Sequence, residues 1–306
     1  MLPVGDGVPN RLDIVDWDGH EVATIRDPGE NGVPAKFAGP APNGAHFVTL
    51  DNAVRSLTGE TLGAVTGQWM WADDSQHLCE LQNVSPSSGV SAEMHYTTLE
   101  RVPELLGEVH TDTTTISTVP LLGSCSATHN LLSVVFDTID WTTDVEEYSI
   151  SPFRLERSID LTNQQILVSS VSEDGAYMVE EVGLPPAEDG PPAWGPGQAS
   201  RIVRVSDMAV MATFDGQIAA VSADDQTLVT STPQNSSETA SVEVWALGGS
   251  TPMATLAGQL AWLLRRPASG DVFLAVTTGN PGANPLDGAR TVIVGADGSL
   301  VPVRLA

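Results

Sequence analysis

The residue types that could perform acid–base or metal chemistry are scattered along this sequence. The six histidines include no pair at the spacing of metal ligands within one element; they are His20, His46, His77, His95, His110 and His129. There is also no Gly-x-Ser-x-Gly nucleophile turn, no phosphate-binding glycine loop and no cysteine cluster. Local motifs therefore name no reaction, although an enzyme that gathers residues from several repeats would leave no local motif.

The stretch 137–147, DTIDWTTDVEE, places many carboxylates around one aromatic residue, Trp141. Carboxylate oxygens such as those of Asp140 and Asp144 suit Ca²⁺, which is the one ion that this stretch suggests. The stretch lacks the glycine and the regular alternation of a calcium loop, so a solvated acidic surface is the favoured interpretation. No cofactor is predicted beyond this calcium option.

A second candidate binding segment is 183–200, GLPPAEDGPPAWGPGQAS, in which five prolines restrict the backbone. Stiffening of this kind lowers the entropy lost on binding. Trp194 could anchor a partner or could cover its own loop. With residues of two other connections, the predicted binding set consists of Asp140, Trp141, Asp144, Glu188, Asp189, Trp194, Asn284 and Asp287.

The chain has two cysteines, Cys79 and Cys125. They could form one disulfide that closes about 46 residues, worth about 4 kcal/mol in the loop-entropy model, or they could be two buried free thiols. A cysteine pair at this spacing fits an exported protein without requiring one. The first ten residues, MLPVGDGVPN, have neither the basic start nor the apolar core of a signal peptide. Either the protein is cytoplasmic, or its export segment has been removed.

The formal charge is −26, with 39 acidic and 13 basic residues. Binding to phosphate backbones and anionic bilayers relies on Lys and Arg, so the sequence predicts no nucleic-acid partner. No apolar run approaches the roughly 20 residues of a membrane helix, which predicts no membrane insertion. A high net charge favours solubility and mutual repulsion, and we expect a monomer.

The elements that must position these residues are short strands joined by turns, because 28 Gly and 21 Pro are spread along the chain and no convincing helix is found. A small polar turn recurs before strand-like runs, and its third position falls at Asn43, Asp73, Thr128, Asp174, Asp224 and Ser269. The mean step of about 45 residues is that of one four-stranded propeller blade. Asp and Asn in such turns are structural first, because they tolerate left-handed backbone angles and hydrogen-bond locally.

The turns SEDGAYM, SADDQTL and APNGAHF resemble degenerate forms of the Ser-Pro-Asp-Gly turn of TolB-like blades, and VEVWALGG is similar to their third strand. The resemblance to TolB-like and WD-repeat propellers spans almost the whole chain. It implies an all-β fold, a β-propeller of four-stranded antiparallel blades in one domain, 1–306. The blades are expected at 35–66, 67–110, 111–162, 163–214, 215–257 and 258–306. A hairpin at 11–26 makes either an incomplete seventh blade or an addition to a six-bladed ring.

The predicted connections on one face are long, at 82–92, 137–146, 183–200, 232–240 and 278–289, whereas the turns of the other face are tight. Loops on a rigid scaffold commonly carry binding. The leading hypothesis is a non-enzymatic scaffold that binds a protein or peptide through this long-loop face, in the extracytoplasmic space of a bacterium. The alternative is a hydrolase or lyase that acts on a sugar or lactone at the central channel, with carboxylates from several blades.

Overall fold

The computed structural model describes residues 2–4, 11–15, 20–26, 37–43, 45–49, 52–56, 58–85, 90–99, 103–111, 118–138, 141–162, 164, 166–182, 199–215, 217–221, 226–231, 240–265, 271–277 and 290–303. These residues fall into two units. One unit consists of Met1–Ala64 and Ile218–Ala306, and the other is Val65–Gln217.

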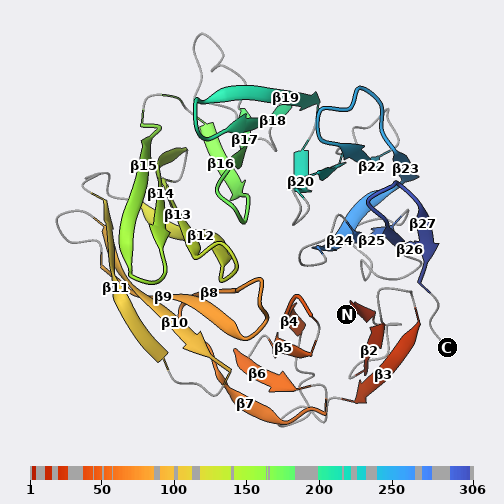
Figure 1. Cartoon of the computed structure of the whole chain (residues 1–306). Helices are drawn as coiled ribbons and strands as arrows, with labels where there is room; N and C mark the ends of the chain where they lie inside the picture. Colours follow the sequence, from red (N-terminus) through yellow and green to blue (C-terminus); the bar gives the residue numbers. More distant parts are fainter. Residues whose placement is uncertain are drawn as a thin grey trace, which may run out of the picture. The chain divides into compact units, whose positions relative to one another are not determined.

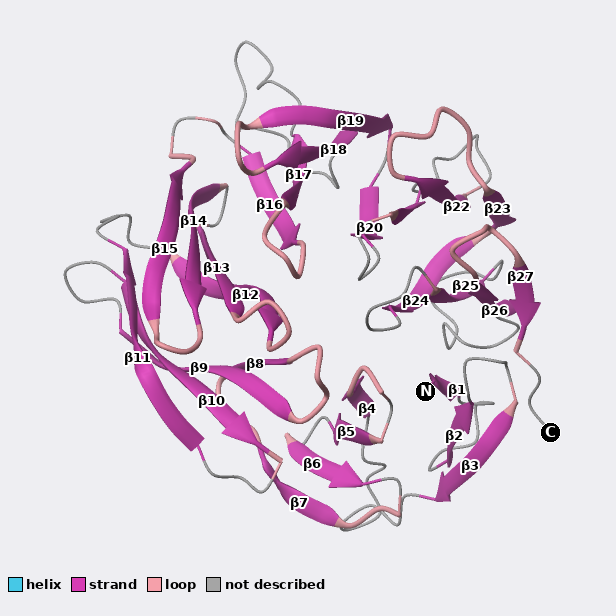
Figure 2. Cartoon of the chain, viewed as in Figure 1, coloured by secondary structure: helices cyan, strands magenta, loops and turns pink. Residues whose placement is uncertain are grey.

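Within these ranges every regular element is a β-strand, as Figure 2 shows. The strands form six four-stranded sheets and one three-stranded sheet, and each sheet consists of strands that follow one another along the chain. No helix in these ranges could span a membrane. Four-stranded antiparallel sheets made of consecutive strands are the blades of a β-propeller, so the expected fold class is confirmed.

The unit Val65–Gln217 contains three sheets, ordered β8 to β11, β12 to β15 and β16 to β19 (Figure 1). Their strands are β8 (Gln68–Trp71), β9 (His77–Ser85), β10 (Val90–Thr98), β11 (Pro103–Thr111), β12 (Val119–Ser126), β13 (Leu131–Asp137), β14 (Thr142–Ser149), β15 (Arg154–Asp160), β16 (Ile166–Val171), β17 (Tyr177–Val182), β18 (Ala199–Arg204) and β19 (Ala209–Asp215).

The other unit contains the three-stranded sheet and three four-stranded sheets. Its strands are β1 (Leu2–Val4), β2 (Arg11–Val15), β3 (Glu21–Arg26), β4 (Phe37–Pro40), β5 (His46–Thr49), β6 (Ala53–Ser56), β7 (Thr61–Ala64), β20 (Gln217–Val221), β21 (Thr227–Ser231), β22 (Ser241–Ala246), β23 (Ala254–Ala257), β24 (Gln259–Arg265), β25 (Val272–Thr277), β26 (Arg290–Val294) and β27 (Leu300–Pro302). The hairpin predicted at 11–26 is present as β2 and β3, but Leu2–Val4 also pairs with β2 and adds a third strand. The single domain, its blade boundaries and the choice between six and seven blades stay predictions.

The core of the unit Val65–Gln217 lies between neighbouring sheets. Strand β13 is buried from Leu132 to Phe136, because apolar residues of both its faces pack against a neighbour. Its even-numbered residues join a cluster with Cys79, Leu81 and Met94 of one sheet. Its Val135 joins a cluster that includes residues of β16 to β18. A sheet with two apolar faces is stable only when both are covered in this way.

The recurrent polar turn joins the first and second strand of a sheet, as its pattern predicts. Asp174 Oδ1 accepts a hydrogen bond from the Ala176 amide at 2.8 Å, and Asp74 Oδ1 accepts one from the Gln76 amide at 2.9 Å. The residue that matches Asp174 is thus Asp74, and the sequence register that placed Asp73 there was wrong by one residue. The next position has a positive φ in both turns, 59° at Ser75 and 70° at Gly175, which glycine adopts without a steric penalty.

Candidate functional site

The sheets of Val65–Gln217 have two distinguishable ends. We call the end that carries the connections β9–β10, β11–β12, β13–β14, β15–β16 and β17–β18 the connection end. The opposite end, which carries turns such as β8–β9, β12–β13 and β16–β17, is the turn end. The connection end corresponds to the face on which the sequence placed its long loops and its binding residues.

Two of the expected long connections are shorter in the structure. Strand β9 continues to Ser85 and β10 begins at Val90, so most of 82–92 is strand. Strand β13 ends at Asp137 and β14 begins at Thr142, which leaves only 138–141 as a connection. These segments were predicted to be loops because they are rich in polar residues, but in the structure many of these polar residues lie on strands. The connections 183–198, 232–239 and 278–289, with Glu188, Asp189, Trp194, Asn284 and Asp287, lie outside the described residues.

Trp141 lies at the connection end, in the short turn between β13 and β14. The Trp141 amide donates to Thr138 Oγ1 at 3.0 Å, and the Trp141 carbonyl accepts from the Thr138 amide at 2.8 Å. These bonds hold the backbone of a half-buried tryptophan in a defined position. Its neighbour Asp140 lies outside the described residues.

Asp144 is a strand residue, which corrects its expected place in a loop. It lies in β14, where its Oδ2 accepts a hydrogen bond from Thr111 Oγ1 at 3.0 Å. Thr111 is the last residue of β11, in the neighbouring sheet. The carboxylate of Asp144 therefore connects two sheets.

A hydrogen-bonded chain joins the next two sheets at the same end. The Val168 amide of β16 donates to Thr142 Oγ1 at 2.7 Å, and Thr142 Oγ1 donates to Asp137 Oδ1 at 2.6 Å. Burial raises the pKa of Asp137 to about 6, although the bond from Thr142 acts in the opposite direction. Asp137 thus accepts a bond from a buried hydroxyl at the expense of its own hydration.

The described carboxylates of 137–147, those of Asp137, Asp144, Glu146 and Glu147, do not gather into one ion site. Glu146 accepts from Tyr148, and Glu147 Oε2 lies 3.3 Å from Arg157 Nε. Successive strand residues point to opposite faces of a sheet, which separates side chains that are adjacent in sequence. Across the described part of the chain, no group of three or more His, Cys, Asp or Glu side chains could hold a metal ion.

A shallow pocket opens at the connection end of the first sheet. It is lined by Thr66, Gly67, Gln68, Leu81, Gln82, Asn83 and Val84. A β-carbon on Gly67 would lie 2.1 Å from the Leu81 carbonyl oxygen, so only glycine lets the chain enter β8 this close to β9. Below the rim, Glu80 is fully buried and accepts hydrogen bonds from the Thr66 amide at 3.0 Å and from Gln82 Nε2 at 3.2 Å. These bonds fix the positions of groups that line the pocket.

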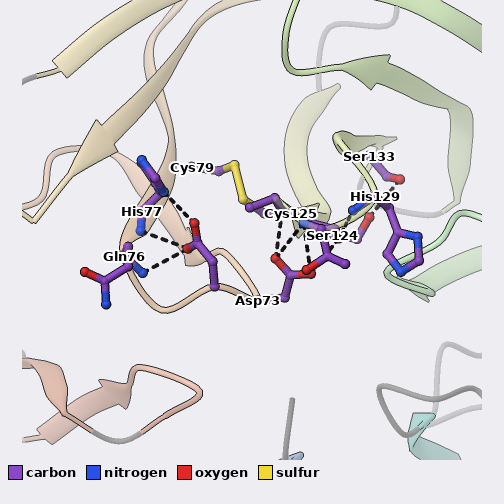
Figure 3. The surroundings of a disulfide bond; sticks show 12 residues. Asp73, Gln76, His77, Cys79, Ser124, Cys125, His129 and Ser133 are labelled. Carbon is purple, nitrogen blue, oxygen red and sulfur yellow. Dashed lines mark hydrogen bonds and ion pairs between the residues drawn. A yellow bond between two sulfur atoms is a disulfide. The ribbon is translucent and has the colours of Figure 1, made fainter. Parts of the chain in front are cut away.

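At the turn end, Cys79 and Cys125 form a disulfide between the first and second sheets of this unit (Figure 3). Their Cα atoms are 6.3 Å apart, and the two residues are 0% and 3% exposed. Beside them Asp73 accepts bonds from the Ala127 amide at 2.7 Å and from Ser126 Oγ at 2.8 Å. Burial alone would raise the pKa of Asp73, but hydrogen bonds from this neighbouring turn outweigh it and lower the pKa. The disulfide and Asp73 together tie the two sheets.

An aspartate–histidine pair lies close to the disulfide. His77 Nδ1 is 2.6 Å from Asp74 Oδ2, and the His77 ring stacks on Tyr96 with centroids 4.4 Å apart. Burial, followed by the charges of Asp74 and Asp73, raises the pKa of Tyr96. No role for His77 was predicted from the sequence, although its position just after a recurrent turn containing Asp74 was a usable signal.

A buried glutamate at the same place in β9 and β17, each the second strand of its sheet, was not predicted from the sequence. Glu80 in HLCE and Glu180 in YMVE are the fourth residues of matching runs. Glu180 is 0% exposed and is paired with Arg201, its cross-strand neighbour. Burial raises the pKa of Glu180 despite the guanidinium beside it. Recurrence of Glu as the fourth residue of these runs, directly after two apolar positions, was the signal for these residues.

No family model matches this sequence, and no curated protein sequence matches it. Solved propeller structures are similar in fold. A eukaryotic initiation factor aligns over 98% of this chain and 85% of its own, with 12% identity and a TM-score of 0.50. Prolyl oligopeptidase B from Galerina marginata aligns over 87% of this chain and 41% of its own, with 12% identity and a TM-score of 0.53. TolB from Acinetobacter baumannii covers 86% and 61%, with 13% identity and a TM-score of 0.44.

The similarities to the initiation factor and to prolyl oligopeptidase B confirm the propeller class that the turn motifs suggested. An identity of 12% to these two structures shows a shared fold and leaves the activity open, because propellers support many unrelated functions.

Proposed function

We propose that this protein is a non-enzymatic propeller scaffold that binds a protein or peptide at the connection end of its sheets. The observation that carries the proposal is the lining of the shallow pocket. Its side chains are amides, one hydroxyl and apolar groups, and none of the seven lining residues is titratable.

Such a lining suits recognition of a polypeptide. Amide side chains of Gln68, Gln82 and Asn83 both donate and accept hydrogen bonds, as the main chain of a partner does. Val84 adds an apolar side chain that is 43% exposed. Trp141, at the same end of the next sheet, is of the residue type that most often anchors protein interfaces.

Acid–base catalysis makes a different demand on a pocket. A hydrolase or lyase of sugars or lactones needs at least two titratable side chains that face the same substrate. Two carboxylates contact residues of the lining: Glu80 accepts bonds from Thr66 and Gln82, and Glu93 accepts one from Asn83 at 2.8 Å. The Asp74–His77 pair lies at the other end of the sheet. A binding function agrees better with this distribution.

The disulfide supports a further part of this proposal, that the protein works outside the cytoplasm. Disulfides form and persist in oxidising compartments and are rare in the reducing cytosol. Both sulfur atoms belong to core residues, so the bond must form while the sheets assemble.

The binding proposal can be tested with a matched pair of variants. Peptides are selected from a random phage-displayed library on the immobilised protein, and their affinities are measured by fluorescence anisotropy. Gln68→Arg puts a long side chain into the pocket, whereas Gln76→Arg makes the same chemical change in the exposed β8–β9 turn at the other end. We expect Gln68→Arg to weaken the selected peptides about tenfold or more, equivalent to about 1.4 kcal/mol, and Gln76→Arg to leave them unchanged. Equal effects of the two variants, or no selectable peptide, would refute the proposal.

A further inference from the structure

The last strand of the third sheet in Val65–Gln217 has an unusual outer edge. Strand β19 pairs with β18 on one side, and no strand of the described chain pairs with its other side. From Ala209 to Phe214 its sequence is AVMATF, with no charge, proline or glycine. Val210 is 51% exposed and Met211 is 41% exposed. From Ala209 to Thr213 the edge therefore offers backbone groups that no described strand pairs with, beside exposed apolar side chains.

Other outer strands in the described chain carry the features that prevent edge-to-edge pairing. Strand β15, RLERSID, has four charged residues in seven, and β11, PELLGEVHT, contains a proline, a glycine and two glutamates. Strands β7, β23 and β27 have four, four and three residues, and β27 includes a proline. Charges, proline and short length are the usual means of protecting a sheet edge. Strand β19 has none of them over its first six residues.

A bulge limits how much of this edge can pair. Ile202 faces Ala212 and Val203 faces Val210, so Met211 is the extra residue of β19. A bulge disrupts the ladder locally and increases the twist. A partner strand that pairs with β19 must therefore be short.

We propose that the outer edge of β19 binds a short extended segment of another protein by strand addition. Main-chain hydrogen bonds would supply the affinity, and Val210 and Met211 would contact alternate apolar side chains of the segment. The net charge of −26 decides the chemistry of the partner. It disfavours a second copy of this chain and favours a segment in which basic residues alternate with the apolar ones.

This edge is separate from the pocket of the proposed function. The pocket lies on β8 and β9, at the start of the unit, whereas β19 is its last strand. Failure of either proposal leaves the other in place, since Gln68→Arg is not expected to alter binding at β19.

A designed probe and two matched variants test the proposal. The probe is a fluorescein-labelled peptide of nine residues that alternates valine and lysine. Val210→Lys places a charge on the β19 edge, and Leu155→Lys places the same charge on β15, where the wild-type residue is 49% exposed. Both variants add one positive charge, so a general electrostatic effect on the cationic peptide is equal in the two.

We expect the peptide to bind the parent protein with a Kd below about 1 mM, Val210→Lys to weaken binding at least about fivefold more than Leu155→Lys does, and hydrogen exchange at 209–215 to slow in the complex. Equal weakening by the two variants would show general charge attraction and overturn the proposal. The absence of binding at 1 mM peptide would also overturn it. Sedimentation velocity provides a third check, because a dimer of the parent that Val210→Lys dissociates would identify a second copy as the occupant.

Discussion

Asp137 provides a direct test of how burial and hydrogen bonding balance at the connection end. The substitution Asp137→Asn keeps an acceptor oxygen for Thr142 Oγ1, which lies 2.6 Å from Asp137 Oδ1. It removes the negative charge that burial disfavours. We therefore expect the variant to be more stable than the parent at neutral pH.

The magnitude follows from the pKa of Asp137, which burial raises from 3.8 to about 6. A difference of this size corresponds to about 3 kcal/mol at high pH. Since the side chain is only partly buried and solvent screens its charge, we expect a gain of about 1–2 kcal/mol at pH 8.

The sign of the pH dependence is also fixed by the raised pKa. Between pH 4 and 6 the folded protein holds the Asp137 proton more tightly than the unfolded chain does, so this group makes the parent lose stability as pH rises through that range. The advantage of Asp137→Asn should be near zero below about pH 4, about half complete at pH 5 and full above about pH 7. Urea unfolding of both proteins at pH 5 and pH 8 measures it.

Asp160→Asn is the matched control, because Asp160 is an exposed carboxylate on β15. Hydrogen bonding to Thr162 lowers its pKa, so its removal should not stabilise the protein at pH 8. The reasoning is refuted if Asp137→Asn destabilises the protein at pH 8, or if its gain is the same at pH 5 and pH 8.

Three further substitutions test the bonds that hold the first two sheets of this unit. Replacing Cys79 and Cys125 together by alanine should lower the free energy of unfolding by about 4 kcal/mol, as measured by urea denaturation against the oxidised parent; an unchanged midpoint would contradict this. Asp73→Ala leaves amides of the neighbouring turn without their acceptor and should lower the free energy of unfolding by about 1–3 kcal/mol. Because hydrogen bonds lower the pKa of Asp73, this loss of stability should be large at pH 7 and should shrink as the pH falls below about 4. Gly67→Ala brings a β-carbon to 2.1 Å from the Leu81 carbonyl at a φ of 71°, so we expect it to destabilise by more than about 1 kcal/mol, with equal stability in thermal unfolding as the contrary result.

The repeat was readable from the sequence because turn chemistry is local. Asp174 and Gly175 act within their own turn, so their residue types reveal the turn wherever it occurs. The second copy, at Asp73 and Asp74, was placed one residue out of register because either aspartate satisfies the local pattern. Only the bonds from Asp73 to the next sheet show which of the two closes its own turn.

The candidate site was less readable because its determinants are not local. Asp144 and Glu147 look like loop residues in an acidic stretch, yet each lies on β14 with a partner from another strand, Thr111 for the first and Arg157 for the second. Thr111 lies 33 residues before Asp144 in the sequence. Alternation of residue types alone could not supply these partners.

Polar groups at the two ends of the sheets fall into two kinds. Some join neighbouring sheets, and others line the proposed binding pocket. At the turn end, Asp73 and the disulfide are used to join neighbouring sheets. At the connection end, Asp137 and Asp144 do the same, while the pocket on β8 and β9 is lined in part by neutral amide side chains. Hydrogen bonds lower the pKa of Asp73, whereas burial raises the pKa of Asp137 to about 6, so these two carboxylates affect stability in opposite directions as the pH changes. The proposed binding function places recognition at the pocket, whose seven lining residues carry no titratable side chain.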